Sequence, residues 1–321
     1  MNKQLGFVFP GQGSQSIGML NALAAQYPEV NKTFAEASEV LNYDLWTLVQ
    51  EGPEDVLNQT ERTQPALLAA GVAIWRLWQN QTQNQNESNP SIMAGHSLGE
   101  YSALVCAGSL EYSIAIQLVA KRGLFMQEAV PSGQGAVAAI VGLDDSTVKA
   151  ICEDCAEGES VAPANYNDPT QIVVAGHLPA VERVVIKAKE SGARLAIKLA
   201  VSVPAHSVLM KPAAVRLAAE LEKVTIKSPQ IPVINNVDVV SATDPAAIKD
   251  ALIRQLYSPV RWVETIQTMA NNHITSIIEC GPGKVLTGLS KRITTAITTM
   301  PTLDPNSLSQ ALQHVKEKEI T

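Results

Sequence analysis

The sequence predicts an α/β protein with two parts, and three observations support this. Short apolar runs alternate with longer helical patterns along most of the 321 residues, which is typical of a parallel sheet covered by helices. Between 136 and 199 the order becomes strand, helix, strand, strand, helix, strand, which is the order of a ferredoxin-like module. A Pro-Ser-Gly-Gln-Gly cluster at 131–135, which disfavours helix and strand, precedes this module and indicates a domain boundary. We therefore expect a large domain formed by 1–130 and 200–321, with a small domain inserted at 131–199.

The first predicted strand is Phe7-Val8-Phe9, and it runs into a glycine-framed loop that contains Gln12. Loops at the carboxyl ends of strands hold the ligand-binding groups of α/β proteins. A neutral amide at this position can donate a hydrogen bond to a substrate without adding charge, although a solvated loop glutamine is the alternative. The loop lacks the lysine of a phosphate-binding P-loop, so a nucleotide site is not indicated.

Helical patterns follow up to the second strand. Apolar residues recur every three or four positions over 21–57, and a longer apolar helix is predicted from Thr63 to Trp78, with Pro65 in its first turn. The next segment, 79–89, is rich in glutamine and asparagine and has almost no apolar residue. We predict a surface loop there.

The sequence Gly95-His96-Ser97-Leu98-Gly99 lies between an apolar run and a helical pattern that ends at a glycine. Strand, sharp turn and helix form the geometry of a nucleophile elbow. Its glycines allow neighbouring backbone to approach closely, and the helix N-terminus directs N–H groups at an oxyanion beside the serine. The alternative is a glycine-bounded turn that contains a serine by chance.

A long apolar helix is predicted over 113–130, and it carries Arg122 next to a glycine. Taken alone, the residue pattern favours an arginine whose aliphatic stem covers apolar surface while its charge reaches solvent. A cation placed deliberately for an acidic ligand is the alternative.

The chain returns to α/β alternation after 200. Loops that carry Gln12, Ser97, Asn235 and Gly281 each follow a short apolar strand, so we expect them to gather at one edge of a parallel sheet. The elements predicted in this half are helices at 212–223, 245–256 and 284–293, a further helix after Pro259, an amphipathic helix near the C-terminus, and strands at 233–234 and 276–279.

Composition excludes several classes of protein. The formal net charge of −7 and the pI near 5.3 argue against a nucleic-acid binder. No apolar run is long enough to span a membrane and no signal-peptide pattern is present, so we expect a cytoplasmic protein. Cys152 and Cys155 form a C-x-x-C in an acidic helical segment without a second ligand pair, so we expect ordinary reduced thiols and no metal.

A serine nucleophile needs a base within hydrogen-bond reach. His96 adjoins the serine, and neighbours in a turn generally point apart, whereas His206 lies where the large domain resumes and is the best candidate. The other histidines, which we expect to be surface or structural, are His177, His273 and His314. Asp238 and Asp250 could orient the base, but their spacing selects neither.

Together these motifs resemble the malonyl-CoA:acyl-carrier-protein transacylases of type II fatty-acid synthesis over nearly the whole chain. The matching segments are Phe9 to Gln15, Gly95 to Tyr101, Arg122-Gly123 with Met126-Gln127, Asn165 to Asn167, Val203 to His206, Asn235 to Val237, Arg254 to Leu256 and Gly281 to Gly283. Their joint occurrence in this order is more specific than any single motif.

The resemblance implies an α/β-hydrolase-like large domain with a ferredoxin-like insert and an active site between them. It implies that Ser97 is the nucleophile and His206 its base, with the histidine oriented by the backbone carbonyl of Gln255 in place of an acid. It also implies an oxyanion hole formed by Gln12 and the backbone N–H of Leu98.

By the same resemblance, Arg122 pairs with the free carboxylate of a malonyl group. The implied partners are malonyl-CoA and, transiently, an acyl carrier protein, with no nucleic acid, no membrane and no bound cofactor or metal. Three alternatives stay open at this point: an acyltransferase of a polyketide pathway, a serine esterase or thioesterase, and a carrier-binding domain without activity.

Overall fold

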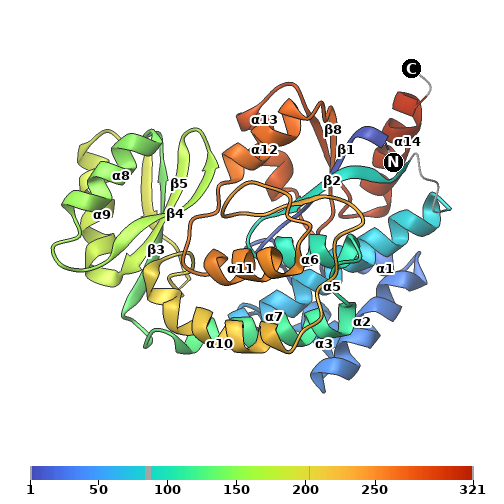
Figure 1. Cartoon of the computed structure of the whole chain (residues 1–321), viewed down its shortest axis with the longest axis horizontal. Helices are drawn as coiled ribbons and strands as arrows, with labels where there is room; N and C mark the ends of the chain where they lie inside the picture. The colour runs from blue at the N-terminus through green and yellow to red at the C-terminus, as the bar shows by residue number, and fades with distance from the viewer. Residues whose placement is uncertain (1, 84–87, 202, 320–321) are drawn as a thin grey trace.

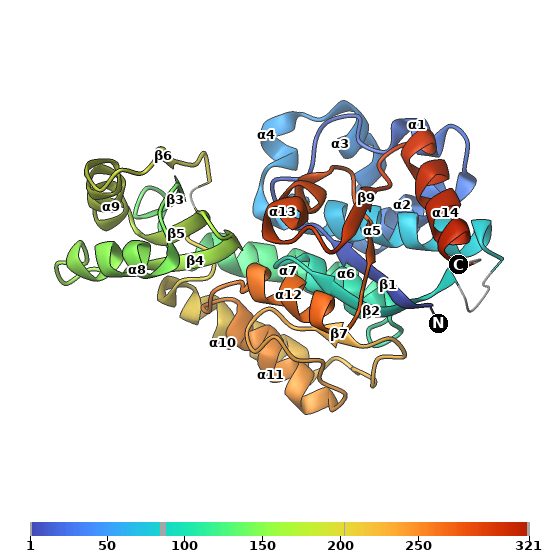
Figure 2. The same cartoon turned by 90° about the horizontal axis from the view of Figure 1, so that it is seen from above.

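The computed structural model describes residues 2–83, 88–201 and 203–319. Two sheets lie side by side, and the smaller one with its two helices projects from the larger part (Figures 1 and 2). All strands of the large sheet pair in parallel. Their spatial order is β7 (Val233–Ile234), β2 (Pro90–Gly95), β1 (Asn2–Phe9), β8 (Ser276–Glu279) and β9 (Thr298–Pro301).

Residues 5–9 of the central strand β1 are buried on both faces. Phe7 and Phe9 belong to the larger hydrophobic core, whereas Val8 between them belongs to a second core with Trp262. Successive side chains of a strand point to opposite faces, so helices must cover both sides of this sheet. This explains why the second half of β1 shows a continuous apolar run and no alternation.

The helices of the large part pack on these two faces. Phe7 meets the edge of Trp78 at a ring-centroid distance of 5.1 Å, which ties β1 to the longest helix. In chain order the helices are α1 (Asn21–Ala24), α2 (Pro28–Leu41), α3 (Leu45–Glu51), α4 (Glu54–Leu57), α5 (Thr60–Gln81), α6 (Gly99–Cys106), α7 (Tyr112–Glu128), α10 (Lys211–Glu222), α11 (Pro245–Gln255), α12 (Trp262–Asn271), α13 (Val285–Ile293) and α14 (Pro305–Glu319).

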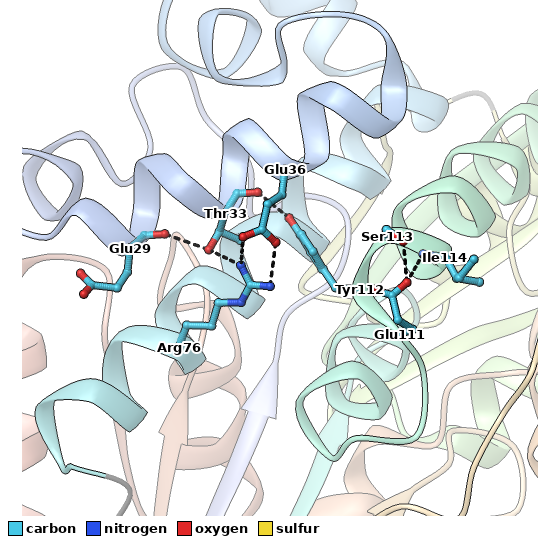
Figure 3. A network of polar contacts seen from close by, with 8 residues as sticks. All are labelled: Glu29, Thr33, Glu36, Arg76, Glu111, Tyr112, Ser113 and Ile114. Carbon is cyan, nitrogen blue, oxygen red and sulfur yellow. Dashed lines mark hydrogen bonds and ion pairs between the residues drawn. The ribbon is translucent and has the colours of Figure 1, made fainter.

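A polar cluster joins α2, α5 and α7 on the outside of the large part (Figure 3). Arg76 on α5 donates two hydrogen bonds to the Glu36 carboxylate and one to Thr33 Oγ1, and its guanidinium lies 4.8 Å from the ring centroid of Tyr112. The Tyr112 hydroxyl donates to the carbonyl of Thr33, and Glu111 accepts from the backbone N–H of Ile114 at the start of α7. This arrangement fixes the three helices relative to one another.

The second sheet is antiparallel throughout and lies between residues 135 and 198. Its strands, in spatial order, are β4 (Val161–Asp168), β5 (Gln171–His177), β3 (Gly135–Val141) and β6 (Leu195–Lys198), with α8 (Asp145–Asp154) and α9 (Leu178–Glu190) between them in the chain. The two helices cover one face. Val137 and Val173 lie on the other face, which borders the large part. The predicted fold class, a parallel α/β domain with a ferredoxin-like module, is confirmed.

Several local predictions need correction. Helix α5 begins at Thr60, contains Pro65 within it and continues to Gln81, so the start of the 79–89 tract is helical and not a loop. Residues 84–87 of that tract lie outside the described residues. Strand β9 was not predicted, because its residues Thr298–Pro301 include two threonines and a proline and form no apolar run. The domain boundaries at 130/131 and 199/200 stay a prediction.

The C-x-x-C pair lies in the core of the small part. Cys152 and Cys155 are both buried there, and burial raises the pKa of Cys152 to about 12, so this thiol is protonated and unreactive near neutral pH. Across the described ranges, no group of three potential ligand side chains could hold a metal ion. The helices seen in residues 2–83, 88–201 and 203–319 include none long and apolar enough to cross a membrane.

Candidate active site

The turn between β2 and α6 holds Ser97 in the left-handed region, at φ 52°. A Cβ added to Gly95 would lie 1.8 Å from the backbone carbon of Gly99, and one added to Gly99 would lie 1.9 Å from the carbonyl oxygen of Phe9. No side chain fits at either position, so both glycines are required for the close approach of the backbone. The arrangement is that of a nucleophile elbow, and a chance serine in an ordinary turn does not explain it.

His206 lies directly against the serine. Its Nε2 is 2.8 Å from Ser97 Oγ, and its Nδ1 is 2.7 Å from the backbone carbonyl oxygen of Gln255 and 3.2 Å from that of Ser258. Carbonyl oxygens only accept hydrogen bonds, so Nδ1 carries the proton and Nε2 is free to accept one. The imidazole therefore faces the serine in the tautomer that a general base requires.

Burial and the nearby Arg122 charge lower the pKa of His206 to about 3. Desolvation is the larger cause, because the residue is only 5% exposed. The imidazole is consequently neutral at physiological pH, as a proton acceptor must be.

Arg122 is 1% exposed, so the interpretation of a surface-reaching arginine is wrong. Its Nη1 donates to Gln64 Oε1 at 2.8 Å, and its Nη2 donates to Gln255 Oε1 at 3.0 Å and to Ser97 Oγ at 3.3 Å. Burial lowers the pKa of the guanidinium, but an arginine keeps its charge in proteins. A fixed cation therefore lies beside the serine, and its direct partners are neutral oxygens.

These residues line a cavity of about 310 Å³ between the two parts. Gln12 and Leu98 belong to the lining, so the loops after β1 and β2 meet there as expected; the Gln12 amide has a single long contact of 3.5 Å, to Thr60 Oγ1. The small part contributes Val137, Ala139, Asn165, Asn167, Gln171, Val173 and Leu199, and helix α13 contributes Val285, Leu286 and Leu289.

The remaining histidines lie away from the serine hydroxyl. His96 is turned toward the small part, where its Nε2 is 2.9 Å from Asn167 Oδ1, and burial lowers its pKa. His177 Nδ1 accepts from the backbone N–H of Ser160, and His314 Nε2 is hydrogen-bonded to Ser276. His273 is exposed in a turn.

The two candidate acids are engaged elsewhere. Asp238 accepts two hydrogen bonds from Arg254, and Asp250 accepts one from the same guanidinium. His206 is hydrogen-bonded to backbone carbonyls, so neither acid is its orienting partner.

Sequence reasoning missed the residues that support this site from behind. Asn236 accepts from the backbone N–H of Ser97 at 2.7 Å and donates to the carbonyl of Gly95 at 2.6 Å. Gln64 and Glu100 are also buried and hydrogen-bonded in this region. The position of Glu100 beside the elbow and of Asn236 after a strand were the available signals, but polarity alone does not separate such residues from solvated ones.

Comparison with known proteins agrees with this geometry. Residues 6–311 match the family model described as acyl transferase domain. The malonyl CoA-acyl carrier protein transacylase of Salmonella typhimurium is 56% identical over 309 residues, covering 96% of this chain and 99% of the relative. The protein of the same name from Escherichia coli is 54% identical over 310 residues, covering 97% and 99%.

Solved structures give the same result. An acyl carrier protein S-malonyltransferase from Vibrio cholerae superposes with a TM-score of 0.92 at 57% identity, covering 96% of this chain and 99% of the other. A malonyl-transacylase in complex with a type II PKS acyl-carrier protein superposes with a TM-score of 0.94 at 53% identity, covering 97% and 99%. The chain therefore belongs to the acyl transferase family, in the branch of the malonyl CoA-acyl carrier protein transacylases.

Proposed function

We propose that this chain transfers a malonyl group from malonyl-CoA to the phosphopantetheine thiol of an acyl carrier protein, as a step of fatty-acid biosynthesis. The observation that carries the proposal is the placement of Ser97, His206 and Arg122 around one cavity. A serine with a neutral base can attack a thioester, and a buried guanidinium suits an acyl group that ends in a carboxylate.

In the first step, Ser97 Oγ attacks the thioester carbonyl while its proton passes to His206 Nε2. The Gln12 amide and the Leu98 backbone N–H are the donors we assign to the resulting oxyanion. When the intermediate collapses, the carbon–sulfur bond breaks, coenzyme A takes the proton from His206, and a malonyl ester remains on the serine.

The second step reverses the first with a different thiol. The carrier's phosphopantetheine thiol gives its proton to His206 Nε2 and attacks the ester carbonyl, and the serine oxygen leaves with that proton. A narrow cavity favours the bound thiol over water as the acceptor. Because these steps use only groups of this chain, the proposal includes no cofactor. Since the donor is a coenzyme A thioester and the acceptor is the thiol of a carrier protein, both of them intracellular carriers, we also propose a cytoplasmic enzyme.

A polyketide pathway is the second candidate, because one solved relative is bound to a type II PKS acyl-carrier protein. Transfer rates to a fatty-acid carrier and a polyketide carrier, measured side by side, decide between the two. A neutral-lipid esterase is disfavoured by Arg122, since such an enzyme has no use for a buried cation beside its nucleophile.

The direct test is acyl-enzyme formation with radiolabelled malonyl-CoA. Ser97→Ala is expected to abolish covalent label, because within residues 2–83, 88–201 and 203–319 the hydroxyl hydrogen-bonded to His206 is that of Ser97. Ser91→Ala serves as the matched control and should label normally, because Ser91 lies on β2 ahead of the elbow and its hydroxyl donates to backbone carbonyls of β1. Retention of label by Ser97→Ala would refute the assignment of the nucleophile.

A further inference from the structure

The side chain of Gln255 contacts more of the site than its backbone role requires. It is fully buried at the end of α11. Its Oε1 accepts from Arg122 Nη2 at 3.0 Å, and its Nε2 donates to the carbonyl oxygen of Ser97 at 3.1 Å. Its backbone carbonyl separately accepts from His206 Nδ1. One residue therefore touches the nucleophile turn, the base and the buried cation.

The orientation of this amide is fixed by charge on both sides. Gln255 Nε2 also donates to Glu100 Oε2 at 2.7 Å, and the same oxygen accepts from the backbone N–H of Asn236 at 2.9 Å. A carboxylate only accepts and a guanidinium only donates. If the amide were reversed, its oxygen would face Glu100 and its NH₂ would face Arg122, and both contacts would become repulsive.

Arg122 gains its position from this bridge. The guanidinium is linked to the Glu100 carboxylate through the Gln255 amide, which accepts from Arg122 and donates to Glu100. The guanidinium is thus held by two amide oxygens, those of Gln64 and Gln255, whose contacts can yield when a stronger acceptor arrives. A direct ion pair would instead occupy the donors that a substrate carboxylate needs.

We propose that Gln255 is a positioning residue through its side chain: it sets the Arg122 guanidinium relative to Ser97, and Glu100 dictates which end of the amide faces the cation. The inference rests on the proposed function, because it concerns the selection of a substrate carboxylate. It predicts that removing the amide lowers the transfer of malonyl groups more than the transfer of neutral acyl groups.

The test compares Gln255→Leu with wild type. This substitution keeps the backbone carbonyl that orients His206 but removes the side-chain contacts to Ser97 and Arg122, so labelling of Ser97 by a neutral sulfonyl fluoride is expected to fall by a smaller factor than malonyl transfer. The preference for malonyl-CoA over acetyl-CoA is expected to fall about tenfold or more, mainly through a higher KM for malonyl-CoA, since a charge-assisted hydrogen bond to the cation is lost. Gln267→Leu, an exposed glutamine on α12, is the matched control.

A second pair of variants tests the part played by Glu100. Gln255→Glu keeps an oxygen toward Arg122 but places a second carboxylate against Glu100, so the thermal midpoint is expected to fall. Adding Glu100→Gln to that variant supplies a donor to the new carboxylate and is expected to restore the midpoint. The malonyl preference should stay low in the double variant, because the new carboxylate pairs permanently with Arg122.

Two results would overturn the inference. One is an equal loss of malonyl transfer, acetyl transfer and sulfonyl fluoride labelling in Gln255→Leu, which indicates a purely structural role. The other is a double variant no more stable than Gln255→Glu alone. A wild-type protein that transfers no malonyl group would instead refute the proposed function together with the inference, so the two failures are distinguishable.

Discussion

Hydrogen-bond polarity decides the chemistry at the scale of single residues. His206 is oriented by carbonyl oxygens in place of an acid, and these fix its tautomer without supplying negative charge. Burial, first, and the Arg122 charge oppose a protonated imidazole in the resting site, and together they outweigh the two carbonyls, which favour it. In the proposed mechanism, the histidine therefore gains a proton only when the serine or the carrier thiol gives one up.

The low pKa of His206 predicts a pH dependence of stability. The unfolded histidine takes up a proton near its ordinary value of 6.5, whereas the folded one does so only near 3. The free energy of unfolding should therefore fall as pH drops from about 6.5 toward 3, by at most about 1.4 kcal/mol per pH unit, and level off below. Urea unfolding of wild type and His206→Asn across this range measures the contribution as a difference.

Glu100 contributes a pH dependence of stability with the opposite sign to that of His206. Burial, as the largest cause, raises the pKa of its carboxyl from 4.5 to about 7, so stability from this group is present at low pH and is lost as pH rises from about 4.5 to 7. Glu100→Gln should remove that loss. If both substitutions leave the pH profile unchanged, the two groups titrate in the folded protein as they do in water.

Removal of the buried cation is expected to change substrate choice. Arg122→Ala should lower kcat/KM for malonyl-CoA about 100-fold, since a buried charge-assisted contact to the substrate is lost, and should raise the tolerance for acetyl-CoA. Arg216→Ala is the control, because that arginine also packs on an aromatic ring but is half exposed. An unchanged malonyl preference in Arg122→Ala would contradict the assignment of Arg122 to the substrate carboxylate.

At the scale of elements, close backbone approach shapes the site. The elbow brings the start of α6 against the end of β1, and the loop after β8 packs on the loop after β1, where a Cβ on Gly281 would lie 2.2 Å from the Pro10 ring. Glu279, buried at the end of β8, accepts from the backbone N–H groups of Leu286 and Thr287 and so holds the first turn of α13. The loops at the carboxyl edge of the sheet therefore hold one another in place by direct backbone packing.

Two glycine substitutions test this packing. Gly99→Ala should destabilise the protein by about 4 kcal/mol or more, or prevent folding, because the added methyl group meets the backbone of Phe9. Gly288→Ala in α13 meets only the Arg292 side chain, at 3.7 Å, and should be neutral or stabilise by about 0.5–1 kcal/mol. Denaturant midpoints of the two variants measure the difference, and equal midpoints would argue against the close approach at the elbow.

At the scale of the whole molecule, the cavity exists only because the two parts are held together. On one side, the backbone N–H of Tyr166 donates to the carbonyl of Val260, and that of Val260 donates to the carbonyl of Ala164. On the other side, Arg292 of α13 donates to Asp168 Oδ2 at 2.5 Å and to Gln171 Oε1 at 3.2 Å. These contacts join the small sheet to the large part, and Gln171 among them lines the cavity.

Loss of the contact between Arg292 and Asp168 should let water into the cavity more easily. Arg292→Met leaves the buried Asp168 carboxylate without its cation, so we expect a higher KM for malonyl-CoA and an increase of about threefold in hydrolysis relative to transfer, as water gains access to the acyl-enzyme. Asp168→Asn should show the same shift in the ratio of hydrolysis to transfer. An unchanged ratio in both variants would mean that the pair does not control access of water.

The sequence by itself determined the elements and their class, because each depends on local pattern. Apolar runs predicted β1, β2 and β8, the order of elements predicted the small module, and the glycines beside Ser97 predicted the elbow. The resemblance of several motifs in one order then pointed to the family and to the site residues. Strand β9 and the helical start of the 79–89 tract were not predicted, because their residues have weak local preferences that tertiary packing overrides.

Only the tertiary structure decided which polar residues are buried and what they face. Arg122 has the same sequence pattern as a surface arginine, and the positions of Glu100 beside the elbow and of Asn236 after a strand do not separate these residues from solvated ones. Burial and partnership depend on contacts between segments as far apart as 158 residues, such as the one from the Gln255 amide to the Ser97 carbonyl, and no local pattern encodes them. The fold buries these groups, and the hydrogen bonds that most of their donors and acceptors form with one another hold the geometry of the site.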